Sequence, residues 1–190
     1  FDGHHLALNL TLYGDSMTLA PSFIGTQPAE VAWGDRYRHQ PMGLEVSRAF
    51  ELMDSLSAEQ KATAVVGDRR QNLDAGPGND GVTPPERGIA GTDLTESQRQ
   101  QLGELIRTWL EILPRPHAQA RMQDIAPTLP RTHFGWWGKT EKESPVYFRI
   151  QGPKVLIEFA HQNLGGNPRQ HLHSVFRDPT NDYGIGVRHP

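Results

Sequence analysis

The apolar residues of this chain recur at every second position near both ends and at helical spacing in between. From Leu6 to Leu12 every second residue is leucine, with Ala, Asn and Thr between them, which is typical of a half-buried strand. Turn residues follow, and residues 17–23 resemble the returning strand of a hairpin. Further along, short β-branched or aromatic segments predict four strands, at residues 133–137, 146–151, 155–161 and 172–177.

The middle of the chain predicts helices. The apolar residues at helical spacing in its first part are Val46, Ala49, Phe50 and Met53. Capping boxes at 57–60 and 95–98 begin two more helices, and the second has an apolar stripe on which we expect Trp109 to be a core residue. Residues 68–93 are rich in Gly, Pro, Asn and Asp, so we expect a long surface loop that is mobile rather than functional.

Strands at both ends with helices between them predict an α+β fold. We expect a single domain over residues 1–190, with a mostly antiparallel sheet formed from both ends of the chain. A helical insertion at about residues 45–126 should pack on this sheet. The first strand begins abruptly, without a preceding segment to cover its apolar face. We therefore expect a missing N-terminal portion, or a second chain, to complete the fold.

Composition excludes several classes of function. The net charge is −3 and the basic residues are scattered, which argues against nucleic acid as a partner. No apolar run approaches the roughly 20 residues of a membrane span. The chain has no cysteine, so any metal ion must be bound through nitrogen and oxygen atoms.

The segment 171–179 is the strongest candidate for a functional site. Because side chains alternate along a strand, His171, His173 and Arg177 should project from the same face. Two imidazoles can bind a metal ion, and a guanidinium beside them can orient an anionic group. If the terminal strands meet in one sheet, His5 joins this pair, whereas His4 should share the leucine face and be partly buried.

Glu158 is a carboxylate within an otherwise apolar strand, a costly position unless the charge is paired, protonated or metal-bound. One interpretation makes it a fourth ligand or the general base; the other makes it the partner of Arg149 or Arg177 in an ion pair. His161, at the end of the same strand, is expected to be an exposed polar residue.

These residues favour a metal-dependent enzyme acting on a small anionic or polar substrate, with hydrolysis slightly preferred. His5, His171 and His173 would bind a divalent zinc, iron, manganese or copper ion, with Glu158 and Arg177 as catalytic residues. The alternatives are a metal-dependent oxidoreductase and a non-catalytic exported binding or scaffold domain. Exposed aromatic rings would serve such a binding domain, but we expect the outward ring of Trp136–Trp137 to pack under the long loop.

Several sequence blocks resemble a bacterial family of proteins with a domain of unknown function, the DUF3500 family. The blocks span nearly all of the chain in the family's order: residues 3–9, 24–31, 134–138, 147–153, 156–159, 171–179 and 181–184. The resemblance places His4, His5, Glu158, His171, His173 and Arg177 inside motif blocks. It implies no established activity. It does imply members with a helical portion ahead of the Gly-His-His motif, and a periplasmic or secreted location.

Overall fold

The computed structural model describes residues 1–190 except 36, 164–165 and 187–190. Its main sheet contains β1 (Asp2–Gly3), β2 (Leu6–Tyr13), β3 (Ser16–Thr26), β6 (Val65–Gly67), β7 (Ile89–Ala90), β8 (His133–Trp137), β9 (Tyr147–Gly152), β10 (Val155–His161) and β11 (Leu172–Arg177). A small separate hairpin consists of β4 (Val31–Trp33) and β5 (Tyr37–His39). The helices are α1 (Gly43–Ser55), α2 (Ala58–Ala64), α3 (Glu96–Leu110) and α4 (Arg115–Ile125), with short 3₁₀ turns at Gly91–Asp93, Ala126–Arg131, Pro168–Gln170 and Asp182–Gly184.

The two ends of the chain form one sheet, as predicted. The order of its strands is β1-β2-β3-β11-β10-β9-β8-β6, with β7 also paired to β8. In the described part of the chain, β6 and β8 form the parallel pair and the remaining pairs are antiparallel. β3 therefore bridges the N-terminal strand β2 to the C-terminal strand β11, which confirms the expected α+β arrangement.

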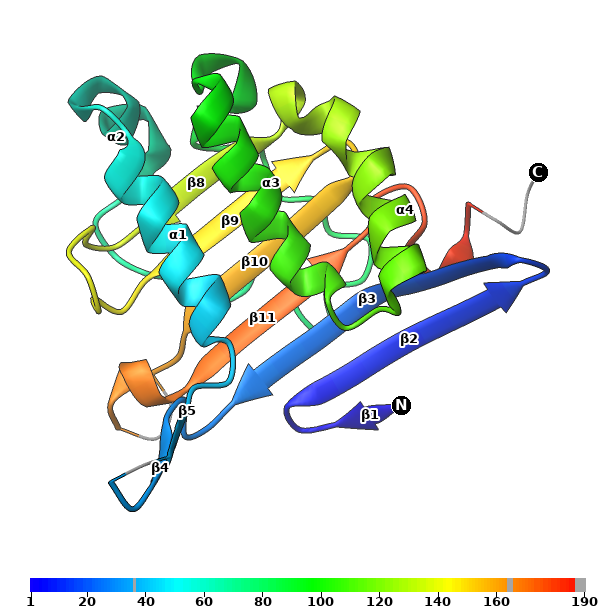
Figure 1. The fold of residues 1–190 in the computed structure, drawn as a ribbon, viewed down its shortest axis with the longest axis horizontal. Helices are drawn as coiled ribbons and strands as arrows, with labels where there is room; N and C mark the ends of the chain where they lie inside the picture. The colour runs from blue at the N-terminus through cyan, green and yellow to red at the C-terminus, as the bar shows by residue number, and fades with distance from the viewer. Residues whose placement is uncertain (36, 164–165, 187–190) are drawn as a thin grey trace.

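Helices α1, α3 and α4 cover one face of the sheet, here called the helix face (Figure 1). The core lies between these layers and includes Phe159 of β10, Phe148 of β9 and Trp136 of β8. Trp109 of α3 is also buried there, and its indole N–H donates to the Ser174 hydroxyl at 2.8 Å. Both predicted capping boxes are present, at the first turns of α2 and α3. None of the helices in the described residues is long and apolar enough to span a bilayer.

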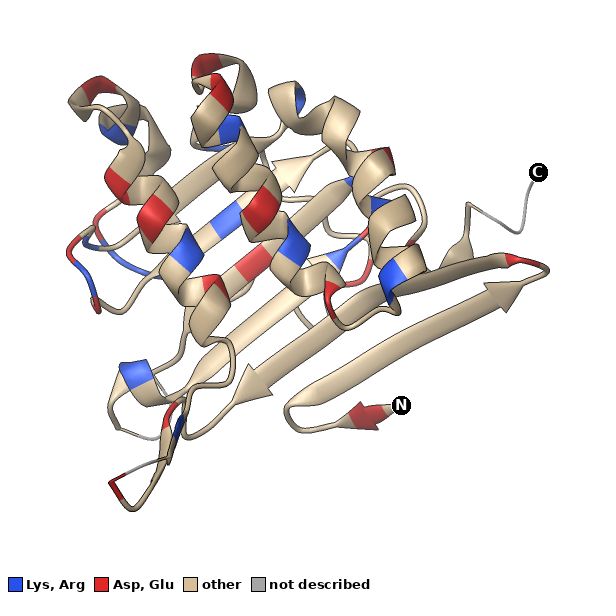
Figure 2. Ribbon diagram, in the orientation of Figure 1, with Lys and Arg blue, Asp and Glu red and all other residues tan. Residues whose placement is uncertain are grey.

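Charged side chains follow this layering. Acidic residues and Arg lie along α1 and α3, whereas the ribbons of β2 and β3 contain no charged residue (Figure 2). The end of the β2–β3 hairpin extends beyond α4 (Figure 1). Leu10 and Leu12 are accordingly 57% and 67% exposed, although the alternation predicts a half-buried strand.

The long loop, residues 68–93, packs on the opposite face of the sheet, here called the loop face. Leu73 contacts the buried residues Trp137, Tyr147 and Ala160 on this face. The outward ring of the Trp136–Trp137 pair thus lies under the loop, as predicted. Buried polar side chains of the sheet hydrogen-bond the backbone of the loop, so several of its residues are anchored to this face.

Candidate metal site

His171 and His173 lie at the start of β11 with their rings on the loop face. Leu172, between them, is buried in the core on the helix face, as strand alternation requires. The Nε2 atoms of the two histidines are 3.0 Å apart. Local strand geometry therefore suffices to bring these two imidazoles together.

His5 reaches the same point from the turn between β1 and β2. Its Nε2 lies 3.1 Å from the Nε2 of His171, across 166 residues of chain. The ligand atoms of His5, His171 and His173 all lie within 4.8 Å of one another. We call these three residues the histidine cluster.

Gly25 of β3 makes this approach possible. It pairs with His173 in the sheet, and its N–H donates to the carbonyl of His5 at 2.8 Å. A Cβ at this position would lie 2.8 Å from the Cδ2 of His5 and 3.0 Å from the Cδ2 of His173. Because Gly25 has no side chain, the rings of His5 and His173 have the space in which they lie.

The surroundings of His173 and His5 favour the neutral form of these two imidazoles. Burial, followed by the neighbouring His171 and His5, lowers the pKa of His173 to about 4. Burial, followed by His4 and His171, lowers the pKa of His5 as well. A neutral imidazole is the form that can ligate a metal ion, because protonation removes the lone pair.

The spacing of the nitrogens fits a shared metal ion. Zinc–nitrogen bonds of roughly 2.0–2.1 Å in tetrahedral geometry separate two ligand nitrogens by about 3.3 Å. The separations of 3.0 and 3.1 Å are close to this value. They also lie in the hydrogen-bond range, although the single lone pair or proton on Nε2 of His171 can pair with only one of the other two rings at a time. The geometry thus permits either a metal centre or a polar cluster.

A cavity of about 400 Å³ opens beside the cluster, and we call it the cluster cavity. The residues that line it are Asp2, Gly3, His4, Ala7, Phe23, Asn72, Leu73, Gly76, Pro77, Asn79, Gln162 and His173. Sequence reasoning missed Gln162, since only strand pairing places it here. It also placed His4 on a partly buried leucine face, whereas His4 is exposed in a turn and lines this cavity.

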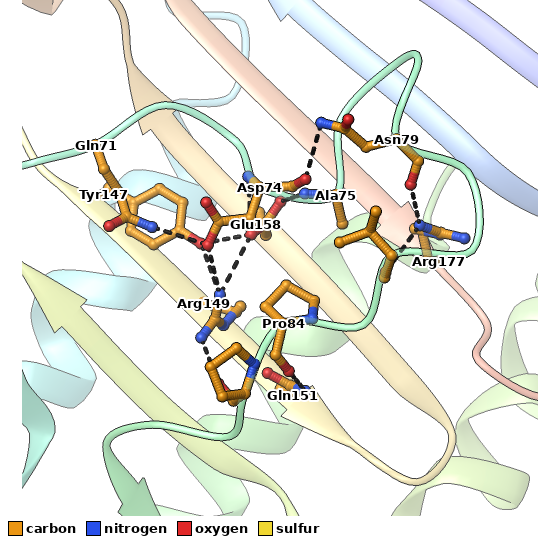
Figure 3. A network of polar contacts seen from close by, with 12 residues as sticks. Gln71, Asp74, Ala75, Asn79, Pro84, Tyr147, Arg149, Gln151, Glu158 and Arg177 are labelled. Carbon is orange, nitrogen blue, oxygen red and sulfur yellow. Dashed lines mark hydrogen bonds and ion pairs between the residues drawn. The ribbon is translucent and has the colours of Figure 1, made fainter.

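Glu158 lies on the loop face but belongs to a separate polar network (Figure 3). Its carboxylate accepts hydrogen bonds from the Tyr147 hydroxyl and from the N–H groups of Asp74 and Ala75. Nη1 of Arg149 lies 3.6 Å from this carboxylate, so the ion pair that the sequence left open is present. Burial is the main cause that raises the pKa of Glu158.

Arg177 also lies at a distance from the cluster, at the other end of β11. Its Nε donates to Asp182 at 2.7 Å, and its Nη1 contacts the carbonyls of Asn79 and Val82 at 3.3 Å (Figure 3). It lines a neighbouring cavity of about 250 Å³, which shares Phe23, among other residues, with the cluster cavity. The structure thus brings the three histidines together and leaves Glu158 and Arg177 outside their contacts.

His161 was expected to be exposed, but it is buried, with 6% of its surface accessible. Its Nδ1 lies 3.1 Å from both the N and the O of Val146. Burial lowers its pKa to about 4. The expectation failed because the end of β10 lies against Val146, the residue before β9, a contact that the strand pattern does not reveal.

The comparisons with known proteins identify a family whose function is unknown. The family model described as "Protein of unknown function (DUF3500)" matches residues 1–185. The chain belongs to this family, as the resemblance predicted. No curated protein and no solved structure matches the chain.

Proposed function

We propose that this member of the DUF3500 family is a metal-dependent enzyme, and that it hydrolyses a small polar substrate, either neutral or anionic. The convergence of three imidazole Nε2 atoms beside a cavity carries this proposal. We further propose a periplasmic or secreted location, which depends on the family resemblance alone.

In this proposal His5, His171 and His173 hold one divalent ion. Three protein ligands leave an open position, and an ion so held lowers the pKa of a coordinated water to near neutrality. His173 lines the cluster cavity, so the open position would face the space that admits substrate. Zinc fits three neutral imidazoles, and iron, manganese or copper remain alternatives.

We propose that Glu158 and Arg177 hold the long loop, residues 68–93, in position. Glu158 binds the N–H groups of residues 74 and 75, next to Gly76 in the cavity wall. Arg177 binds the carbonyl of Asn79, another residue of that wall. Both side chains therefore support the wall of the cluster cavity from the loop face of the sheet.

A non-catalytic binding domain is the second candidate. The observation in its favour is that the Nε2 separations of 3.0 and 3.1 Å lie in the hydrogen-bond range, so that His171 can pair with either His5 or His173 without any ion. In that case the cavity would bind a ligand, and the histidines would form part of its polar wall.

Elemental analysis of protein purified without a histidine tag distinguishes the two candidates. Near-stoichiometric metal in the wild type, lost in His173→Ala and retained in His39→Ala, is the result expected of a metal enzyme. His39 is exposed in β5, outside the site, and serves as the matched control. Equal metal content in all three proteins, or none in any, would leave the binding domain as the surviving candidate.

Hydrolysis is tested next on the metal-loaded protein. p-Nitrophenyl acetate should be cleaved faster by wild-type protein than by His173→Ala, and a chelator should abolish the difference. Metal-loaded protein that cleaves neither esters nor amides would contradict the hydrolase assignment while leaving the metal site intact.

A further inference from the structure

The side-chain amide of Gln162 is buried without a hydrogen-bond partner. Its Nε2 has no partner among the described residues, and the residue as a whole is 6% exposed. An unpaired buried amide costs roughly 1–3 kcal/mol, so such a group requires an explanation. Other buried polar atoms are also unpaired, on Arg70, Gln101, His133, Arg149 and Gln151, but those residues do not line the cavities described here.

Gln162 lies immediately beside the histidine cluster. Its backbone N–H donates to the carbonyl of His171 at 2.8 Å, extending the pairing of β10 with β11. Strand alternation places its side chain on the same face as Ala160, the residue opposite His173. It lines the cluster cavity together with His173, so its side chain borders the space beside the histidine cluster.

We propose that Gln162 is the positioning residue of this cavity, and that its amide N–H donates to the carbonyl oxygen of a neutral amide or ester. This inference rests on the proposed function and assigns its substrate class. The missing partner of the amide would be the substrate itself.

The charges of the cavity favour a neutral ligand. Asp2 is its acidic residue, and its lining includes no Lys or Arg among the described residues. Arg177, Asp2 and Asp80 line the neighbouring cavity, and Arg177 is paired with Asp182. Ala7, Phe23, Leu73 and Pro77 provide an apolar wall. A carbonyl compound with a small apolar portion is complementary to these groups, whereas in metal-free protein a free carboxylate would meet the carboxylate of Asp2 with no Lys or Arg in the described lining to offset it.

Two variants test the role of Gln162 in zinc-loaded protein. Gln162→Leu keeps a similar volume and removes the donor, and Gln162→Glu places an acceptor where the donor was. N-methylacetamide, titrated by NMR, should shift the side-chain N–H resonances of Gln162. Its affinity should fall roughly three- to tenfold in Gln162→Leu, the effect of one hydrogen bond, and further in Gln162→Glu. Imidazole, which binds the metal but carries no carbonyl, should bind wild type and Gln162→Leu equally.

Stability and metal content separate this role from a structural one. Gln162→Leu should bind zinc as wild type does and unfold at the same or a higher temperature, because it removes an unpaired buried amide. A lower melting temperature, or an unchanged affinity for N-methylacetamide, would overturn the assignment. If wild-type protein retains no zinc, the proposed function fails, and the same titration in metal-free protein decides the role of Gln162. Tighter binding of acetate than of N-methylacetamide to metal-free protein would refute the neutral substrate class.

Discussion

Substituting Gly25 with alanine perturbs the histidine cluster without removing a ligand. The backbone accepts the change, since the φ of Gly25 lies outside the left-handed region. The new methyl group, however, would lie 2.8 Å from the ring of His5, 3.0 Å from that of His173 and 3.0 Å from the carbonyl oxygen of Leu172. Ordinary van der Waals contact begins at 3.4 Å, so the two rings must move by about 0.6 Å and 0.4 Å.

These displacements exceed what a metal site tolerates. Ligand distances in such sites hold to within about 0.2 Å, and changes that disturb ligand orientation typically cost 10- to 100-fold in metal affinity. We expect Gly25→Ala to weaken zinc binding by about this factor. We also expect about 1–3 kcal/mol less stability toward unfolding, the usual cost of overpacking.

The assay is a competitive zinc titration of chelator-stripped protein, combined with urea unfolding. Gly103→Ala is the control, because a methyl group there, on helix α3, makes only ordinary contacts of 3.4 and 3.5 Å. It should leave zinc affinity unchanged. Wild-type zinc affinity in Gly25→Ala would refute the packing argument, and equal losses in both variants would show that the effect is not local.

Two further predictions concern metal removal and pH. A chelator should lower the melting temperature of wild-type protein but not of His173→Ala, because an ion that binds only the folded state stabilises it; equal shifts in both would contradict this. Burial raises the pKa of Glu158 above 4.5, so its folded carboxyl holds a proton more tightly than the unfolded one. The contribution of Glu158 to stability is therefore complete below pH 4.5 and is lost as pH rises through the raised pKa. In metal-free protein, Glu158→Gln should gain stability relative to wild type over that range by urea unfolding, and a pH-independent difference would contradict it.

The sequence alone determined the features that depend on neighbouring residues. The bounds of β8, β10 and β11 match their predicted ranges, and β2 begins at Leu6 as predicted, because period-two alternation is a local property of a strand. Capping boxes located the starts of α2 and α3 for the same reason. The shared face of His171 and His173 followed from a separation of two residues along one strand.

Only the tertiary structure revealed the contacts between segments that are distant in the sequence. Strand order, which sequence cannot specify, placed β3 between β2 and β11 and brought His5 to His171. The long loop has few apolar residues, so its position depends on backbone groups that bind Glu158 of β10, and its composition alone suggested mobility. Gln162 became a candidate only when strand pairing placed its unpaired amide in the wall of the cavity beside the histidines.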